Sequence, residues 1–560
     1  MDNNEIAKRF SLLSKLMEIH GENSFKSKTY SIAAYKIEQL TVELQTLSPE
    51  KIFSINGIGD AIVKKILELT ETGNLKALDE IISKTPEGIL EMMKIKGIGP
   101  KKISIIWKEM NVENIGELLY ACHENRLSLL KGFGKKTQDN VIESIEFFLK
   151  QKGNYLYAQV EQLATDLEHL LCKIFSSEKI KITGAFARQN EIIEELEFVI
   201  PSSEKNISNI ISTVPGFYFL ENTDQYFLYK YNDGIKVKLH VADETNLVQR
   251  IFETSSSHEF TQSFYEKFPQ IEIHNSGSDA EIFNAAGLQY IPPFLREKQS
   301  IIDLAKENKI PAVIQPGDIK GIVHCHSNWS DGANTLEDLA NACVAKGYEY
   351  LVISDHSKSA FYAQGLIEEK INAQHKLVDD LNTKLTPFKI FKSIESDILN
   401  DGSLDYSNSV LSTFDLVIAS VHSNLKMTEE KAMMRLMNAI ENPYTTILGH
   451  MTGRLLLSRK GYPVDHKKII DACASNNVVI EINAHPRRLD MCWQWLEYAL
   501  SKNVMVSIDP DAHSIEEFDN TRYGVLVAQK GMVTSQLNLS SFSLNELENF
   551  LKENKKKRNI

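Results

Sequence analysis

The feature that most constrains the fold is a regular alternation of short apolar runs and helical segments over residues 318–560. Seven of these runs have the length and composition of buried strands: Gly321–His326, Tyr350–Ser354, Phe388–Ser393, Asp415–Val421, Thr445–Leu448, Asn477–Ile482 and Val504–Ile508. Strands that alternate with helices form parallel sheets. Seven such units predict a distorted (βα)7 barrel related to the TIM fold.

Histidines and carboxylates stand where these predicted strands end, and in such barrels the chemistry collects at that edge. The polar residues at these ends are His324, His326, Asp331, Asp355, His356, Glu395, Asp397, His422, His450, Asp511 and His513. Period-2 alternation makes His324 and His326 point to one side and leaves Cys325 to pack on the other. A single histidine of this kind is usually a structural hydrogen-bonding group. Imidazoles and carboxylates at this density predict a centre for Zn²⁺ or Mn²⁺.

Length and composition describe the rest of the chain broadly. A chain of 560 residues is expected to form about three or four domains. Acidic and basic residues balance in residues 1–150, so the net charge of -13 lies in the remainder. No apolar run approaches the roughly 20 residues of a membrane span. The six cysteines form no CxxC pair, so we expect a reduced, cytoplasmic protein without membrane contact.

Residues 1–150 are predicted to be almost entirely helical and contain one element three times. Each copy is an apolar-x-Gly-apolar-Gly turn followed by a helix with paired lysines: Gly57 and Gly59 with Lys64 and Lys65, Gly97 and Gly99 with Lys101 and Lys102, Gly132 and Gly134 with Lys135 and Lys136. Such turns let a backbone approach a phosphate, and the helix start and the lysines attract it. The three copies resemble helix-hairpin-helix motifs and predict sequence-independent DNA binding; a purely structural helical repeat is the alternative.

The order of elements in residues 1–300 resembles bacterial family X DNA polymerases. The run Phe25–Tyr30 resembles their amino-terminal gap-binding domain. This resemblance implies that Lys26 and Tyr30 bind a downstream 5′ end and that Lys65 stands at the Schiff-base position. An ordinary surface lysine is the alternative for Lys65.

The palm region departs from the family pattern. Where the family has an Asp-x-Asp pair, this chain has Glu195 and Glu197, and Lys238 stands where the family has a third aspartate. The family's three carboxylates hold two metal ions. Because a lysine repels cations, we expect no Mg²⁺ here, an ion pair between Lys238 and one glutamate, and a degenerate polymerase site.

The carboxy-terminal motifs His324–Gly332, Ser354–Ser357 and Gly449–Arg454 resemble the polymerase-and-histidinol-phosphatase (PHP) domain over its full length. The resemblance implies two to three divalent ions. His324, His326, Glu395 and Asp511 would hold one; Glu395, His422 and His450 a second; Asp331, His356 and His513 a third. Arg454 is a predicted phosphate clamp. The predicted supporting residues are Asp355 and Asp397, with Asn483 and Arg487.

The combined prediction is a multidomain, monomeric DNA-repair enzyme with metal-dependent 3′–5′ exonuclease activity. Its partner is gapped, nicked or 3′-ended DNA, held mainly through backbone phosphates. The predicted divisions are a lyase-like domain (1–80), a helix-hairpin-helix domain (81–150), an α+β nucleotidyltransferase-like palm and thumb (151–300), a linker (301–317) and the PHP domain (318–560). Three alternatives stay open: an active gap-filling polymerase with a proofreading nuclease, a small-molecule phosphatase and a non-enzymatic scaffold.

Overall fold

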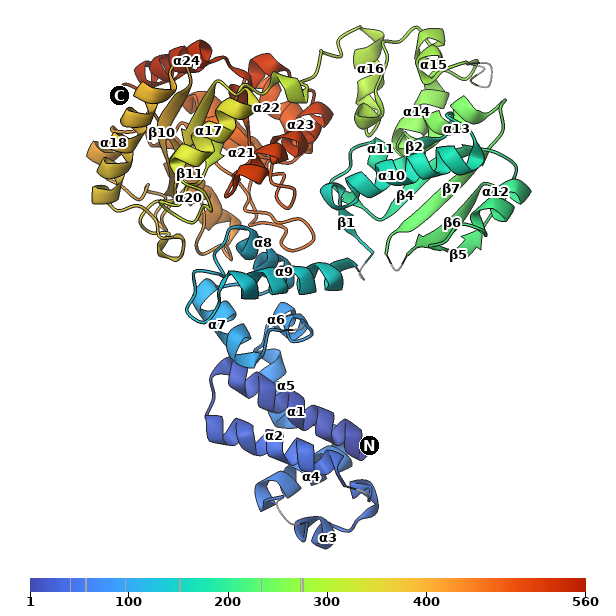
Figure 1. Cartoon of the computed structure of the whole chain (residues 1–560), viewed down its shortest axis with the longest axis vertical. Helices are drawn as coiled ribbons and strands as arrows, with labels where there is room; N and C mark the ends of the chain where they lie inside the picture. Colours follow the sequence, from blue (N-terminus) through green and yellow to red (C-terminus); the bar gives the residue numbers. More distant parts are fainter. Residues whose placement is uncertain are drawn as a thin grey trace. The chain divides into compact units, whose positions relative to one another are not determined.

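The computed structural model describes the chain in two compact units, Met1–His123 with Leu127–Phe148 and Glu124–Arg126 with Leu149–Ile560 (Figure 1). Outside the described residues lie Thr41, Asn56, Gly57, Lys96, Gln151, Lys152, Asp233, Glu272, His274 and Asn275, and the side chains of Phe147 and Lys150. Gly57 of the first predicted hairpin is therefore outside the described residues. Among those described, no helix combines the length and the hydropathy that crossing a membrane requires.

The first unit is helical, as predicted. Its helices are α1 (Asn3–His20), α2 (Ser24–Glu38), η1 (Leu44–Thr46), α3 (Pro49–Phe53), α4 (Asp60–Thr72), α5 (Lys76–Ser83), α6 (Glu87–Met92), α7 (Pro100–Met110), α8 (Ile115–His123) and α9 (Lys135–Lys150). Asp2 and Glu5 form a capping box at the start of α1. The antiparallel pair α1 and α2 buries Phe10 against Tyr30, with ring centroids 5.7 Å apart.

The second unit begins with a five-stranded sheet in the order β2-β4-β7-β6-β5, in which only β4 and β7 are parallel. The strands are β1 (Tyr155–Leu156), β2 (Lys181–Thr183), β3 (Ile192–Ile193), β4 (Glu195–Pro201), β5 (Phe217–Asn222), β6 (Tyr226–Tyr231) and β7 (Lys236–Ala242). The helices are α10 (Tyr157–Phe175), α11 (Gly184–Ala187), α12 (Glu204–Ile211), α13 (Leu247–Thr254), α14 (His258–Lys267), α15 (Asp279–Ala285), η3 (Pro293–Leu295) and α16 (Ser300–Lys306). Helix α10 lies across one face of the sheet and buries Val160, Leu167 and Leu171 against it (Figure 1).

The remainder of this unit is a seven-stranded parallel sheet, in the chain order β8 to β14. The strands are β8 (Gly321–Cys325), β9 (Tyr350–Ile353), β10 (Lys389–Asp397), β11 (Leu416–Ser420), β12 (Ile447–Leu448), β13 (Val479–Asn483) and β14 (Val506–Asp509). The first and last strands approach each other, because His326 N donates to Ala512 O at 2.8 Å and Ala512 N donates to His324 O at 3.2 Å. The sheet is therefore a nearly closed barrel, and the predicted fold class is confirmed.

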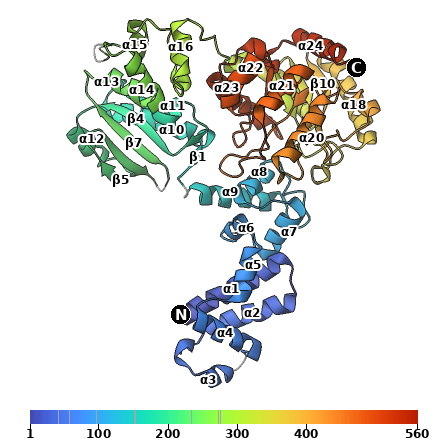
Figure 2. The same cartoon turned by 180° about the vertical axis from the view of Figure 1, so that it is seen from behind.

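Helices surround the barrel, and Figure 2 shows α20, α21 and α23 along its outside. The helices are η4 (Pro316–Asp318), α17 (Leu336–Lys346), η5 (Phe361–Ala363), α18 (Glu368–Leu385), α19 (Asn408–Leu411), α20 (Glu429–Glu441), α21 (His466–Asn476), η6 (Trp493–Trp495), α22 (Leu496–Ser501), η7 (Ile515–Asn520), α23 (Thr521–Lys530), η8 (Ser535–Leu537), η9 (Leu539–Ser541) and α24 (Leu544–Lys557). Strands β8, β11 and β13 are buried along their whole length. Burial on both faces explains why parallel strands appear in the sequence as continuous apolar runs.

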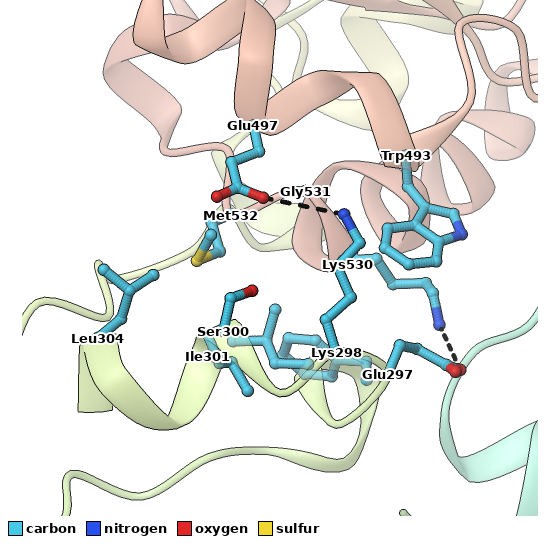
Figure 3. A pocket seen from close by; sticks show the side chains of 12 residues that line it. Glu297, Lys298, Ser300, Ile301, Leu304, Trp493, Glu497, Lys530, Gly531 and Met532 are labelled. Atoms are coloured by element: carbon cyan, nitrogen blue, oxygen red, sulfur yellow. Dashed lines mark hydrogen bonds and ion pairs between the residues drawn. The ribbon is translucent and has the colours of Figure 1, made fainter. Parts of the chain in front are cut away.

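Buried charges connect the five-stranded part of this unit to the barrel (Figure 3). Lys530 Nζ donates to Arg188 O at 2.5 Å and to Asn190 Oδ1 at 2.9 Å, and it lies 3.2 Å from Glu297 Oε1. The pocket beside these groups has a volume of about 30 Å³. That volume has room for about one or two water molecules and not for a nucleotide.

Candidate functional site

The nine predicted ligands all lie at the carboxyl end of the barrel, on different strands and the loops that follow them. The side chain of each of the nine residues is at most 9 % exposed. Two of them, His324 and Asp511, have left-handed backbones, with φ of 61° and 52°. A register shift between Ile322 and Cys325 accompanies this turn in β8. Non-glycine residues in this conformation are strained, and such strain concentrates at functional sites.

The ligand atoms face one another at separations typical of atoms that share an ion. Asp511 Oδ1 lies 3.4 Å from His324 Nε2 and 3.1 Å from His326 Nε2. Asp331 lies 3.5 Å from both His356 Nε2 and His513 Nε2. Ligands that surround one tetrahedral ion at about 2.0–2.1 Å are separated by roughly 3.4 Å. These distances therefore fit coordination of a common ion.

Glu395 occupies the middle of the cluster. Its Oε1 lies 3.3 Å from His324 Nε2, 3.1 Å from His422 Nε2 and 3.0 Å from His450 Nε2, and its Oε2 lies 2.9 Å from His356 Nδ1. A carboxylate with histidines on both oxygens is suited to bridge two ions. This position agrees with the bridging role that the family resemblance implies for Glu395.

The grouping of the ligands differs in part from the expected one. Three compact groups consist of the expected residues: His326, Asp331, His356 and His513; His324, His326 and Asp511; and His356, Glu395 and His422. His326 and His356 each belong to two groups, which the sequence could not show. Several buried atoms also have no hydrogen-bond partner among the described residues, namely His324 Nε2, Asp331 Oδ2, Glu395 Oε2 and His513 Nε2. Buried polar atoms are normally satisfied, so these atoms fit ligands of metal ions.

The electrostatics of the cluster support the same assignment. Burial alone would raise the pKa of the Glu395 carboxyl, but His422, His324 and His356 hold it well below its ordinary value. Burial favours neutral His422, but Glu395 and Asp397 raise the pKa of that ring to about 9. Burial, together with His513 and His356, lowers the pKa of His326. The carboxylates thus remain ionised, and cations can replace the protons that balance them.

The predicted supporting carboxylates contact the ligands or their loops. Asp397 Oδ1 lies 2.5 Å from His422 Nδ1, which leaves Nε2 of that ring toward Glu395. Asp355 accepts hydrogen bonds from Ser327 N, Ser327 Oγ, Ser330 Oγ and Gln374 Nε2. Asp355 thereby holds the loop between His326 and Asp331. Cys325 is buried among apolar residues, as expected.

Glu481, whose carboxylate contacts Nδ1 of His324, was not among the predicted site residues. Glu481 Oε2 lies 2.5 Å from His324 Nδ1, and its Oε1 accepts from His450 N and Asn483 Nδ2, both at 3.0 Å. Asn483 Nδ2 also donates to Asp511 Oδ2 at 3.0 Å. The only available signal was period 2, which places Glu481 and Asn483 on the same face of β13.

The guanidinium of Arg454 is bound by groups of the chain itself, which argues against its predicted role as a phosphate clamp. Its guanidinium donates to Arg488 O at 2.9 Å, to Glu191 Oε1 at 2.6 Å and to Leu489 O. The buried ion pair with Glu191 holds a barrel loop against the five-stranded part of the unit. Arg488, which was not among the predicted site residues, lies near a predicted ligand, with Nε 3.8 Å from Asp511 Oδ2.

In the palm-like sheet, both glutamates have basic partners on the neighbouring strand. Lys238 Nζ pairs with Glu195 Oε1, which confirms the expected contact, and His240 Nε2 lies 2.8 Å from Glu197 Oε2. Gly184 has φ of +67°, and a Cβ there would lie 1.9 Å from Glu197 Oε1. The glycine is thus required for the carboxylate to lie over the turn.

The described hairpins leave their glycine backbones accessible. Gly97 and Gly132 both have φ of +92°, a left-handed conformation that favours glycine. A Cβ at Gly59, Gly97, Gly99, Gly132 or Gly134 would meet no atom within 4 Å in the described part of the chain. Gly59 and Gly99 are the N-caps of α4 and α7. The lysines in the first two turns of these helices are exposed or half-buried: Lys64, Lys65, Lys101, Lys102, Lys135 and Lys136.

The predicted 5′-end residues have different environments. Lys26 is exposed on α2. Tyr30 is buried with its ring in the core, and burial raises the pKa of its phenol. Lys65 Nζ lies 2.5 Å from Glu68 Oε2 on the same helix. Tyr30 therefore packs in the core of this unit, whereas Lys26 is exposed.

Comparisons with known proteins cover both ends of the chain. Residues 1–75 match a helix-hairpin-helix domain, residues 89–146 a SAM-like helix-hairpin-helix tandem and residues 323–485 a PHP domain. The "DNA polymerase/3′-5′ exonuclease PolX" of Bacillus subtilis is 31% identical over 99% of this chain and 100% of its own length. A "probable phosphatase" of Thermoanaerobacter sp. is 25% identical over 42% of this chain and 95% of its own length. A "probable phosphatase" of Shewanella frigidimarina is 27% identical over 29% of this chain and 62% of its own length.

Proposed function

The chain belongs to the bacterial family X DNA polymerases that carry a carboxy-terminal PHP domain, and on this premise we propose that it is a DNA-repair enzyme that shortens 3′ ends by metal-dependent hydrolysis. One observation carries the proposal: nine histidines and carboxylates meet at one end of the barrel, with unsatisfied atoms among them. The relative from Bacillus subtilis is named a 3′-5′ exonuclease as well as a DNA polymerase. This supports the direction of digestion.

The cluster fits two to three divalent transition-metal ions, Zn²⁺ or Mn²⁺, held by His324, His326, Asp331, His356, Glu395, His422, His450, Asp511 and His513. Bound ions of this kind activate water at neutral pH and neutralise charge on phosphoryl oxygens. The chain's own groups fix the ligand geometry. Glu481 and Asp397 accept from Nδ1 of His324 and His422 and thereby direct Nε2 of each ring toward Glu395.

We propose that the palm does not synthesise DNA. Lys238 already pairs with Glu195, and His240 Nε2 lies 2.8 Å from Glu197 Oε2. An ammonium about 4 Å from a divalent ion repels it by several kcal/mol even at an effective dielectric of 20. The alternative is a gap-filling polymerase with a proofreading nuclease. It draws support from the name of the Bacillus subtilis relative, which includes DNA polymerase.

The amino-terminal hairpins would hold DNA through its backbone phosphates, because their glycine turns and helix starts offer N–H groups and nearby lysines. We propose the domain division 1–80, 81–150, 151–300, 301–317 and 318–560, with the DNA-binding parts first and the nuclease last. A small-molecule phosphatase, which the shorter relatives favour, needs no hairpins of this kind.

The test uses the full chain with gapped DNA labelled at the 3′ or 5′ end, in Mn²⁺, with and without deoxynucleotides. We expect progressive loss of the 3′ label, no extension, and no activity in EDTA or in His324→Ala with His326→Ala. The control is His169→Ala with His258→Ala, two exposed histidines outside the barrel. Full activity in the barrel double variant or in EDTA would reject the proposal.

A further inference from the structure

A cavity of about 440 Å³ lies beside the loop that connects two of the metal-ligand positions. Its walls include Asn328, Trp329, Leu336, Gln364, Lys370 and Leu377. The volume is in the range of pockets that hold small organic ligands. None of these residues is a predicted metal ligand, so the role proposed for the ligand cluster does not account for this cavity.

The loop between the predicted ligands His326 and Asp331 also forms part of the cavity wall. Asn328 is two residues after His326, and Trp329 is two residues before Asp331, so their Cα atoms lie within about 7.6 Å of those ligands' Cα atoms. Ser327 Oγ accepts from Trp329 N at 3.2 Å and donates to Asp355 at 2.7 Å. The loop is therefore held in place, with the cavity next to the cluster.

The chemistry of the walls favours an uncharged, flat ligand. Trp329 supplies an aromatic surface, and Leu336 and Leu377 supply apolar ones. The amides of Asn328 and Gln364, both exposed, offer donors and acceptors. The wall also includes Glu337, which offsets the charge of Lys370. A phosphate site would carry excess positive charge, so this pocket suits a nucleobase better than a phosphate.

We propose that this pocket binds the base of the 3′-terminal nucleotide while the phosphate on its 5′ side lies at the ligand cluster. The proposal rests on the proposed function and adds a subsite to it. Stacking on Trp329 would hold bases of any sequence, since every base has an aromatic face. The amides of Asn328 and Gln364 would contact its polar edge. Lys370 Nζ donates to Gln364 O at 3.3 Å and so supports that wall.

The experiment compares two substrates of the full chain in Mn²⁺. The p-nitrophenyl ester of thymidine 5′-monophosphate carries a base, whereas bis(p-nitrophenyl) phosphate carries none. We expect Trp329→Leu to raise KM for the thymidine ester by roughly ten-fold, within the range for losing one base stack. The same variant should leave bis(p-nitrophenyl) phosphate within two-fold. Gln364→Ala, at an exposed side chain, should shift KM in the same direction by less.

Trp495→Leu is the matched control, because it removes a half-buried tryptophan of the same domain outside the pocket. Equilibrium binding of thymidine 5′-monophosphate provides a second measurement without turnover, with Kd expected to rise about ten-fold in Trp329→Leu. Equal losses on both esters, or unchanged KM and Kd in both pocket variants, would overturn the subsite. If the unmodified chain hydrolysed neither ester, the Kd for thymidine 5′-monophosphate would decide on the subsite, and 3′-end shortening of gapped DNA would decide separately on the proposed function.

Discussion

Glu481 Oε2 lies 2.5 Å from Nδ1 of His324, while Nε2 of the same ring lies 3.3 Å from Glu395 Oε1. The two carboxylates therefore contact opposite nitrogens of one buried imidazole. A carboxylate behind a ligand histidine fixes the tautomer and makes the ring more basic. Glu481 is thus expected to govern metal binding without contacting an ion.

Replacing Glu481 with glutamine should weaken binding of the most tightly held Mn²⁺ by about 10- to 100-fold, because the amide is a poorer acceptor for Nδ1–H. The measurement is the Mn²⁺ dissociation constant of metal-stripped protein. Glu516→Gln, at an exposed position after the predicted ligand His513, is the control and should bind as the unmodified chain does. Unchanged affinity in Glu481→Gln would show that the contact is structural only.

Lys101→Glu with Lys102→Glu should weaken DNA binding for all sequences alike. Each lost phosphate contact should reduce the slope of log affinity against log salt by about one unit. The measurement is fluorescence anisotropy with labelled gapped DNA at several salt concentrations.

The matched control for the hairpin variant is Lys8→Glu with Lys15→Glu, which changes the same charge at exposed positions on α1. This control should bind DNA more tightly than the hairpin variant. Equal affinities in the two variants would indicate that only net charge matters and that the hairpins form a structural repeat.

Glu195→Gln with Glu197→Gln should leave both 3′-end shortening and the absence of primer extension unchanged. The reason is that Lys238 and His240 already occupy these carboxylates. The measurement is template-dependent incorporation of labelled deoxynucleotides in Mg²⁺ and in Mn²⁺. Incorporation by the unmodified chain that disappears in the double variant would establish the palm as catalytic.

Lys530 should make stability depend on pH in alkaline solution. Burial lowers its pKa to about 8, below its ordinary value of 10.5. Between these values the unfolded chain binds more protons, so this residue makes the free energy of unfolding rise with pH. The contribution is roughly 1–2 kcal/mol between pH 8 and 9.5.

The check on Lys530 is thermal denaturation of the unmodified chain, Lys530→Met and Lys298→Met at pH 8 and 9.5. Lys530→Met should lose this rise, whereas Lys298→Met, a more exposed lysine of the same pocket, should keep it. The same pH dependence in all three proteins would contradict a buried, easily deprotonated Lys530.

Local sequence patterns predict the seven barrel strands and place the candidate metal ligands at their carboxyl ends. Both follow from local rules, since strands alternate with period 2 and their carboxyl ends share one edge of the barrel. The predicted strand bounds differ from the observed ones. Strand β10 extends to Asp397 because Ser393–Asp397 continue to pair with Leu416–Ser420. Glu395 and Asp397 thus lie within the strand instead of beyond its predicted end at Ser393.

The contacts between groups that are far apart in the sequence depend on the tertiary structure. Glu481 reaches His324 from 157 residues away, and Glu191 pairs with Arg454 across 263 residues. It also decided that Tyr30 packs against Phe10. Local periodicity gives the face on which a side chain lies, but its partner depends on how the elements pack, which no local pattern encodes.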